Sequence, residues 1–317
     1  MDHLMFSLNA TMPVFLTMVL GFALHQLRII DDSFAGKLNK LVFVVALPVM
    51  LFQQLATTDF VSVWDTKFVL FCFGATLLSI GLAFLVSLWI PNKAERGEFV
   101  QAAYRSSAAI LGIAYTQNIY GDAGMTPLMI IGSVPLYNMM AVVVLAVTAP
   151  KENGAPQPGG ELMRRTLKGI VTNPIILGIL AGLVWSLLKL PMPTILGKTI
   201  NNVGCLATPL GLLAMGASID PRKVRGKMKP AACAVIMKLV GLCCIFLPLA
   251  VWLGFRDAKL VAIMVMLGSP TTVSSFVMAK NMGHEGTLTS NAVVMATVMG
   301  AFTLTFWLWL LRSLGLV

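Results

Sequence analysis

The sequence predicts an all-α membrane protein with ten transmembrane helices, arranged as two inverted repeats of five in which broken helices 4 and 9 cross. Three observations lead to this fold class. Of the 317 residues, 57% are hydrophobic and 11% are charged, whereas soluble domains carry roughly 25% charged residues. Ten apolar stretches approach the length of about 20 residues that a transmembrane helix needs. One polar linker divides them into two sets of five, and similar motifs occur in both sets.

The ten apolar stretches give the expected spans, which we place at residues 8–27, 36–56, 68–90, 99–119, 125–148, 170–189, 195–218, 229–253, 258–280 and 287–312. We expect the first to be retained, because a secretory signal begins with a basic region and this stretch follows Asp2 and His3. All five cysteines fall within the expected spans, so no pair of loop cysteines is available for a disulfide.

The basic residues indicate the orientation of the spans. Fifteen Lys and Arg residues lie in or next to the loops that follow spans 1, 3, 5, 7 and 9, and six lie on the opposite side. Because cytoplasmic loops carry the excess of basic residues, we expect both termini on the outer side of the cytoplasmic membrane. Residues 149–169 should lie in the cytoplasm. The net charge of +10 follows from this asymmetry and does not point to nucleic acid as a partner. A contact of residues 222–229 with membrane lipid stays open.

The linker at residues 151–169 is polar and rich in Pro and Gly. It separates a first five-helix repeat, residues 1–150, from a second, residues 170–317. Because five is odd, the second repeat enters the membrane in the opposite orientation, as in inverted-repeat secondary transporters.

Matching segments support the repeat. "TMPVFLTMVLG" at 11–21 is similar to "TNPIILGILAG" at 172–182, and Pro48 and Pro209 are separated by the same interval as these two segments. In spans 5 and 10, Asn138 corresponds to Asn291, at a slightly shorter interval.

Spans 4 and 9 contain the expected breaks. Span 9 carries Gly-Ser-Pro-Thr-Thr at 268–272, and proline both removes a backbone donor and clashes with the preceding turn. Span 4 matches it through "LGIAYT" from Leu111 and "LGSPTT" from Leu267, so we expect the second break at 111–114. Broken helices that meet at the midplane form the substrate site of such transporters. The alternative is a proline kink healed by neighbouring Ser or Thr side chains.

Several short motifs occur together in a characteristic order. They are Arg-Ser-Ser at 105–107 followed by "GIAY" and "YG", "PLYN" at 135–138, "NP" at 173–174, "PLGLLAMGASIDP" at 209–221 and "SPTTVSSFVMAK" at 269–280. With these motifs the chain resembles the auxin efflux carrier family, in particular its bacterial organic-acid permeases, over nearly all ten spans. Two departures are Ala114, where the family has its crossover proline, and Ser107, where it has asparagine.

The resemblance implies a scaffold made of spans 1, 2, 6 and 7 and a transport domain made of spans 3–5 and 8–10. It places the substrate site at the crossing of spans 4 and 9 and implies small organic anions as substrates. It also implies a basic residue at the position of Lys238.

Two basic residues lie within the expected spans, Arg105 in span 4 and Lys238 in span 8, while all thirteen acidic residues fall in loops or at span ends. A charge at the bilayer centre costs at least about 2.5–3.5 kcal/mol, and a fixed cation beside broken helices suits a carboxylate. We expect the substrate site to contain Arg105, Ser106, Ser107, Ile113, Ala114, Asn138, Lys238, Ser269, Pro270, Thr271 and Thr272.

Structural alternatives stay open for the polar residues of this set. Lys238 could hold carbonyl groups freed by a broken helix. Arg105 could reach the cytoplasmic face along its own stem. Asn138 and Asn291 could simply form hydrogen bonds between helices.

From these residues we expect a secondary-active or potential-driven transporter of a mono- or dicarboxylate, similar to auxin, malate or malonate, that works by alternating access. An anion channel and a substrate-sensing receptor of the same fold are the alternatives. An enzyme is not expected, since the histidines lie at span edges and neither a phosphate loop nor a Cys/His metal cluster occurs. We therefore expect no cofactor and no metal. Without an acid inside a span, the sequence favours uniport over proton or sodium coupling; symport and homodimerisation stay open.

Overall fold

The computed structural model describes the whole chain except residues 1–12, 14–15, 58–63, 122–123, 150–171 and 219–220. Every regular element in the described part of the chain is a helix. After a first helix at Leu16–Gln26, the helices are α2 (Asp32–Leu41), α3 (Leu47–Ala56), α4 (Thr66–Ser87), α5 (Lys93–Tyr104), α6 (Ala108–Tyr120), α7 (Thr126–Thr148), α9 (Pro174–Leu187), α10 (Thr194–Gly204), α11 (Ala207–Ala217), α12 (Pro221–Ile236), α13 (Leu242–Trp252), α14 (Asp257–Gly268), α15 (Ser274–Asn281) and α16 (Thr287–Ser313).

Six helical stretches of the described chain are long and apolar enough to cross a membrane. They are Asp32–Ala56, Thr66–Ser87, Thr126–Thr148, Thr194–Ala217, Lys227–Trp252 and Thr287–Ser313. Two of them contain a wider π-helical turn, which joins α2 to α3 and α12 to α13. The other expected spans coincide with the shorter apolar helices Leu16–Gln26 and α9 and with the two interrupted pairs α5–α6 and α14–α15. The structure thus shows an all-helical membrane protein, while the ten-span inverted arrangement stays a prediction.

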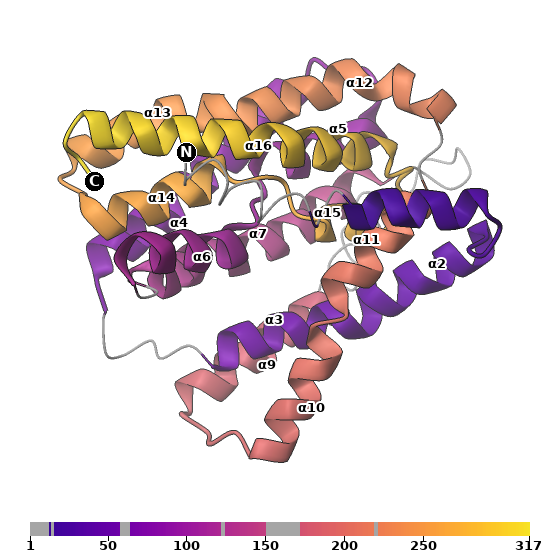
Figure 1. The fold of residues 1–317 in the computed structure, drawn as a ribbon, viewed down its shortest axis with the longest axis horizontal. Coiled ribbons are helices and arrows are strands. Elements are labelled where there is room, and N and C mark those ends of the chain that lie inside the picture. The colour runs from indigo at the N-terminus through magenta and orange to yellow at the C-terminus, as the bar shows by residue number, and fades with distance from the viewer. Residues whose placement is uncertain (1–12, 14–15, 58–63, 122–123, 150–171, 219–220) are drawn as a thin grey trace, which may run out of the picture.

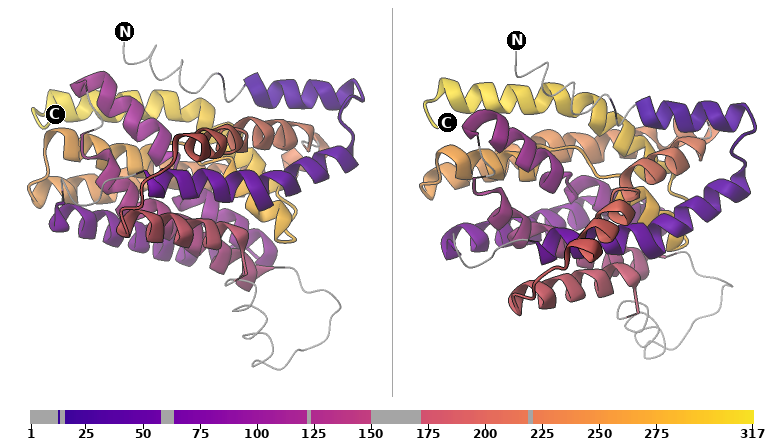
Figure 2. Two further views of the ribbon diagram at one scale, coloured as in Figure 1. Left: turned by 90° about the horizontal axis from the view of Figure 1, so that it is seen from below. Right: turned by 60° about the horizontal axis from the view of Figure 1, so that its bottom comes forward.

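The helices pack in two groups (Figures 1 and 2). The smaller group contains the first helix, α2, α3, α9, α10 and α11, with α3 packed along α9 and α11 along α2. The larger group contains α4 to α7 and α12 to α16, and in it α4 packs on α7 and α12 on α16. The groups meet mainly where α15 packs against α2 and α11, and where α7 touches α9.

Corresponding helices of the two halves begin at a nearly constant interval along the chain. The helices that start at Thr126 and Thr287 are separated by the same interval along the chain as Pro48 and Pro209. The interrupted pairs, which start at Lys93 and Asp257, are separated by almost the same interval. The shorter intervals expected for the later spans therefore do not describe where these helices lie. "LGIAYT" and "LGSPTT" occupy different places in their helices, so their similarity does not reflect equivalent positions.

Two close approaches of backbone to backbone also repeat at this interval. A β-carbon at Gly21 would lie 2.5 Å from the carbonyl oxygen of Leu213, and one at Gly182 would lie 2.8 Å from that of Phe52. The interval along the chain from Gly21 to Gly182 equals the interval from Phe52 to Leu213. Each half therefore supplies the glycine for one contact and the facing backbone for the other. This exchange is what a two-fold axis between the halves produces.

Polar contacts join the helix ends at each end of the bundle. At one end, Lys227 of α12 pairs with Glu95 of α5. At the other, Lys259 of α14 pairs with Asp65 at 2.6 Å, where Asp65 also caps the start of α4. The hydrogen bond from Lys259, followed by that from the Phe68 backbone, lowers the pKa of Asp65 below its ordinary value. Both pairs connect loops that the sequence predicts to lie on the same side of the membrane.

Candidate functional site

The break between α14 and α15 follows from Pro270. Helix α14 ends at Gly268, and Ser269 has an extended backbone with φ −76° and ψ 154°. In an α-helix the N–H of residue 270 would bond the carbonyl of Met266, but proline has no N–H. The Met266 carbonyl instead accepts hydrogen bonds from Lys238 Nζ at 3.1 Å and from the Tyr137 hydroxyl at 3.3 Å. The sequence predicted this break at the correct residues.

Lys238 holds the second carbonyl that the break releases. Its Nζ donates to the Leu267 carbonyl at 2.5 Å, and the side chain is fully buried within the π-helical turn before α13. The last carbonyls of a helix carry partial negative charge, which favours a cation. The ammonium group therefore caps the C-terminal end of α14.

The second break lies at Arg105–Ser107, between α5 and α6, and the expectation of a break at 111–114 was wrong. Residues 111–114 lie within α6, where Ala114, a strong helix former, takes the place of a helix-breaking proline. Arg105 instead has φ −67° and ψ 147°. The two serines after it favour bonds outside a helix.

The two breaks cross, and each forms hydrogen bonds to backbone carbonyl groups at the other. The Ser107 N–H donates to the Pro270 carbonyl at 2.9 Å, and the Ser106 and Ser269 hydroxyl oxygens lie 2.5 Å apart. The Thr271 hydroxyl donates to the Ala102 carbonyl at 2.7 Å, which the end of α5 leaves without a helical partner. Each break thus supplies donors for the carbonyls of the other. The exchange removes much of the cost of unpaired backbone groups within a bilayer.

Arg105 lies at this crossing and is the central charged group of the site. Its side chain is 2% exposed, so it does not extend to the cytoplasmic face. The guanidinium donates to Asn138 Oδ1 at 2.8 Å and Ser274 Oγ at 2.7 Å, and one nitrogen lies 2.7 Å from Met278 Sδ. Its Nε is buried without a hydrogen-bond partner. No carboxylate among the described residues pairs with it.

Two adjoining cavities lie beside the crossing, with volumes of about 690 and 530 Å³ including the space that opens outward. Both lie between the two helix groups. The smaller group contributes Leu47 and Met50 of α3 and Thr208 of α11, and the larger contributes the two breaks. Residues that line both cavities are Leu47, Met50, Ser107, Thr208, Thr272 and Ser274. The walls are therefore mostly apolar and hydroxyl-bearing, with the Arg105 guanidinium as the charged group in the second cavity.

The structure brings most of the expected site residues together. Those that line a cavity are Arg105, Ser106, Ser107, Asn138, Pro270, Thr271 and Thr272. Ser269 is fully buried behind them, against Ser106. Lys238 lines neither cavity and holds α14 as described above. The side chains of Ile113 and Ala114 lie outside the described residues.

Several polar cavity residues were missed from the sequence. Tyr137 and Gln54 line the second cavity, and Thr208 and Ser274 line both. Ser274 holds Arg105, and its position at the first turn after the Pro270 break could have indicated this role. Thr208 and Gln54 belong to helices without an interruption next to them, so no local pattern marks them. Within the described residues, no three His, Cys, Asp or Glu side chains form a group suited to a metal ion.

The sequence is similar to those of known membrane transport proteins. Residues 6–308 match the family described as "Membrane transport protein". The chain is 24% identical over 306 residues to a "Putative malonate transporter" of Rhizobium meliloti, covering 95% of each protein. It is 22% identical over 308 residues to an "Uncharacterized transporter" of Methanothermobacter thermautotrophicus, covering 95% of this chain and 97% of that protein.

Proposed function

The chain belongs to the membrane transport protein family, which includes the auxin efflux carriers, and from this premise we propose that it carries a small organic anion across the cytoplasmic membrane. The observation that carries the proposal is the buried Arg105 guanidinium at the crossing of two broken helices. The name of the malonate transporter relative supports a carboxylate as the substrate.

Arg105 is suited to bind a carboxylate because its own partners are neutral. A buried cation without a counter-ion is costly, and an anionic substrate would supply the missing charge while it is bound. Arginine also matches carboxylate geometry better than lysine does, through its planar set of donors. The uncharged walls of the cavities would accept the rest of a small substrate, with Thr208, Thr272 and Ser107 as hydroxyl partners.

The two helix groups support a mechanism of alternating access. The cavities lie between the groups, so a movement of the larger group past the smaller one would change the side to which the site opens. The smaller group corresponds to the expected scaffold and the larger to the expected transport domain. The reciprocal contacts of Gly21 and Gly182 support an inverted repeat, because a two-fold axis between two halves of five spans each would produce such an exchange.

We propose that Lys238 stabilises the break rather than contacting the substrate. Its ammonium group has two carbonyl partners and lies behind the cavity wall. Half-helix C-terminal ends coordinate the coupling cation in some transporters with broken helices, and here a lysine side chain takes these carbonyls. This arrangement favours potential-driven uniport over sodium coupling, with symport as the alternative.

Uptake into proteoliposomes tests the function. Labelled malonate should accumulate with saturation, and an excess of other mono- or dicarboxylates should compete with it. Arg105→Gln should weaken binding about ten- to a hundredfold, since hydrogen bonds to charged groups contribute roughly 1.5–3 kcal/mol. Arg96→Gln is the matched control on α5, because Arg96 donates to the Ile90 carbonyl away from the crossing.

Three results would contradict the proposal. Flux that rises without saturation would favour an anion channel. Binding without flux would favour a receptor, and equal affinity in the Arg105 and Arg96 variants would remove Arg105 from the site.

A further inference from the structure

Helix α15 of the larger group touches the smaller group along one stripe of side chains (Figure 1). The stripe consists of Val273, Val277 and Asn281, which follow one another at four-residue intervals and so lie on one face of the helix. Val273 and Val277 are 8% and 1% exposed. Both also line the larger of the two cavities beside the crossing. The stripe is therefore part of the cavity wall as well as of the contact between the groups.

The smaller group meets this stripe with Gly211 of α11 and with Val42, which begins the π-helical turn between α2 and α3. A β-carbon at Gly211 would lie 3.3 Å from Val273 Cγ1 and 3.4 Å from Val277 Cγ2. Val42 Cγ1 lies 3.8 Å from the same position, and the Val42 side chain is fully buried. Glycine at position 211 thus allows α15 to lie directly against α11, and a larger side chain there would push the two helices apart.

A hydrogen bond between the groups lies at the end of the stripe. Asn281 Nδ2 donates to the Asn39 carbonyl of α2 at 3.3 Å and to the Val277 carbonyl of its own helix at 2.8 Å. If the groups separated, Asn281 would keep the bond within α15, and the valines would leave no charge unpaired. The contact can therefore open and re-form at a lower cost than the separation of a buried ion pair would require.

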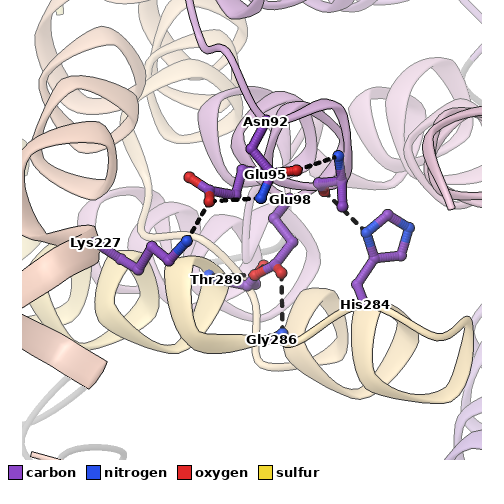
Figure 3. Close-up of polar contacts among 8 residues, drawn as sticks. Asn92, Glu95, Glu98, Lys227, His284, Gly286 and Thr289 are labelled. Atoms are coloured by element: carbon purple, nitrogen blue, oxygen red, sulfur yellow. Dashed lines mark hydrogen bonds and ion pairs between the residues drawn. The ribbon is translucent and has the colours of Figure 1, made fainter. Parts of the chain in front are cut away.

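Hydrogen bonds to α5 hold both ends of α15 within the larger group. Near the start of α15, the Ser275 carbonyl accepts a hydrogen bond from Gln101 Nε2 at 2.9 Å. Beyond its end, where α16 begins, the Glu98 carboxylate accepts hydrogen bonds from the Gly286 and Thr289 N–H groups at 2.9 and 3.0 Å (Figure 3). We therefore expect α15 to move together with α5, so that the stripe leaves its partners in the smaller group as one unit.

The contact lies on the side of the cavities that we expect to face the cytoplasm. Helix α15 runs from the crossing to the loop after span 9, and α11 runs from the cavities to the basic stretch at 222–229. Helix α2 begins directly after the loop that follows span 1. By the positive-inside rule, we expect all three of these loops in the cytoplasm. The contact would then separate the cavities from the cytoplasm and leave the outer side as their entrance.

We propose that this stripe, packed on Asn39, Val42 and Gly211, is a cytoplasmic gate that is closed in this structure. The gate opens when the larger group carries α15 away from α2 and α11, and the cavities then connect to the cytoplasm. Because the two valines belong to the cavity wall, the same movement that opens the gate also uncovers the site. The role of the gate in uptake rests on the proposed transport function, whereas the access that it controls can be measured without a substrate.

A disulfide across the closed gate tests the proposal. In the full chain without its five native cysteines, Gly211→Cys and Val277→Cys place two thiols in direct contact, as a disulfide requires. Oxidation should link them and stop uptake into proteoliposomes, and reduction with dithiothreitol should restore the rate of the unoxidised variant.

The matched control is the pair Met192→Cys and Gly197→Cys, which lies within the smaller group. A β-carbon at Gly197 would lie 3.2 Å from Met192 Cγ, a separation similar to that across the gate. Oxidation of this pair should leave uptake unchanged. Failure of the gate thiols to link, or undiminished uptake by the fully linked gate variant, would overturn the proposal.

Labelling from each side of the membrane gives a readout that needs no substrate. Thr208→Cys places a thiol in both cavities, and an impermeant thiol reagent reaches it only from a side to which they are open. Gly211→Val should keep α15 from packing on α11 and so increase labelling from the cytoplasmic side. Gly36→Val in α2 is the control and should not, since nothing lies within 4 Å of its β-carbon position.

The two readouts separate a failure of the gate from a failure of the transport proposal. Equal cytoplasmic labelling of the Gly211 and Gly36 variants would contradict the gate, whether or not the protein transports. Increased labelling in the Gly211 variant, without saturable uptake by the reduced disulfide variants or the wild type, would support the gate and contradict the transport function alone.

Discussion

At the residue scale, the site depends on two buried cations with different partners. Arg105 holds neutral side chains and keeps one nitrogen unpartnered, whereas both partners of Lys238 are carbonyls of α14. Since only Arg105 lines a cavity, the two residues should respond differently to substitution. Arg105 should control affinity and Lys238 should control stability.

Lys238→Met tests this distinction, because methionine keeps a similar length without charge or donors. It leaves the Leu267 carbonyl buried and unpaired, which costs roughly 1–3 kcal/mol and lowers the thermal midpoint by about 2–4 °C per kcal/mol. Substrate affinity, measured by competition in proteoliposomes, should stay within about threefold of wild type.

The matched control is Lys67→Met, which removes a bond to the carbonyl of Leu253 at an exposed helix end. Its effect on stability should stay within about 0.5 kcal/mol. An affinity loss of about tenfold or more in Lys238→Met, with the melting temperature of the wild type, would show that Lys238 contacts the substrate.

At the element scale, the broken spans depend on close packing with neighbouring helices. The Pro270 ring packs directly on α16, where a β-carbon at Gly300 would lie 2.5 Å from its Cγ. The start of α4 and the start of α14 are held together by the Asp65–Lys259 pair at the other end. Both contacts join helices of the larger group, so a substitution at either contact should change how these helices pack.

Gly300→Ala should separate α16 from the Pro270 break. Overpacking of this kind typically costs about 1–3 kcal/mol, so both the thermal midpoint and the uptake rate should fall. Gly81→Ala in α4 is the control, since nothing lies within 4 Å of its β-carbon position. Alanine should stabilise that helix by up to about 1 kcal/mol. Equal stability of the two variants would argue against tight contact at Gly300.

The Asp65–Lys259 pair should contribute a pH dependence of its own. Because the folded state lowers the pKa of Asp65, its contribution to stability is present at neutral pH and is lost as the pH falls through that lowered pKa. In thermal melts between pH 7 and pH 3, Asp65→Asn should lose part of the acid-induced decrease. Lys259→Gln should have the same effect, and additive losses in the double variant would show that the two residues are not coupled.

At the scale of the whole molecule, two groups of helices enclose the site from opposite sides. Six long apolar helices show that the chain crosses a membrane several times, and the contacts between helix ends keep loops of one predicted side together. We infer the orientation in the membrane from the basic residues, and the inverted relation of the halves from the reciprocal glycine contacts.

Labelling tests the orientation. Single cysteines introduced into residues 149–169 of a cysteine-free variant should react with an impermeant thiol reagent only from the cytoplasmic side. Cysteines at either terminus should react only from outside, because the expected spans are even in number. Labelling of residues 149–169 from the outer side would remove both the orientation and the inverted-repeat argument.

The sequence by itself determined the membrane class, the family, and the break at Pro270. These follow from composition, from motifs in a fixed order, and from a residue that cannot donate its backbone hydrogen bond wherever it lies. It also identified Arg105, since a charge within an apolar span is rare enough to indicate a role.

Only the tertiary structure decided the position of the second break and the separate roles of Arg105 and Lys238. The break at Arg105–Ser107 has no proline, and it is satisfied by bonds to Pro270 and Thr271, which belong to the other half of the chain. A local sequence pattern can show that a backbone group has no hydrogen-bond partner within its own helix. The partner itself is determined by how distant helices pack.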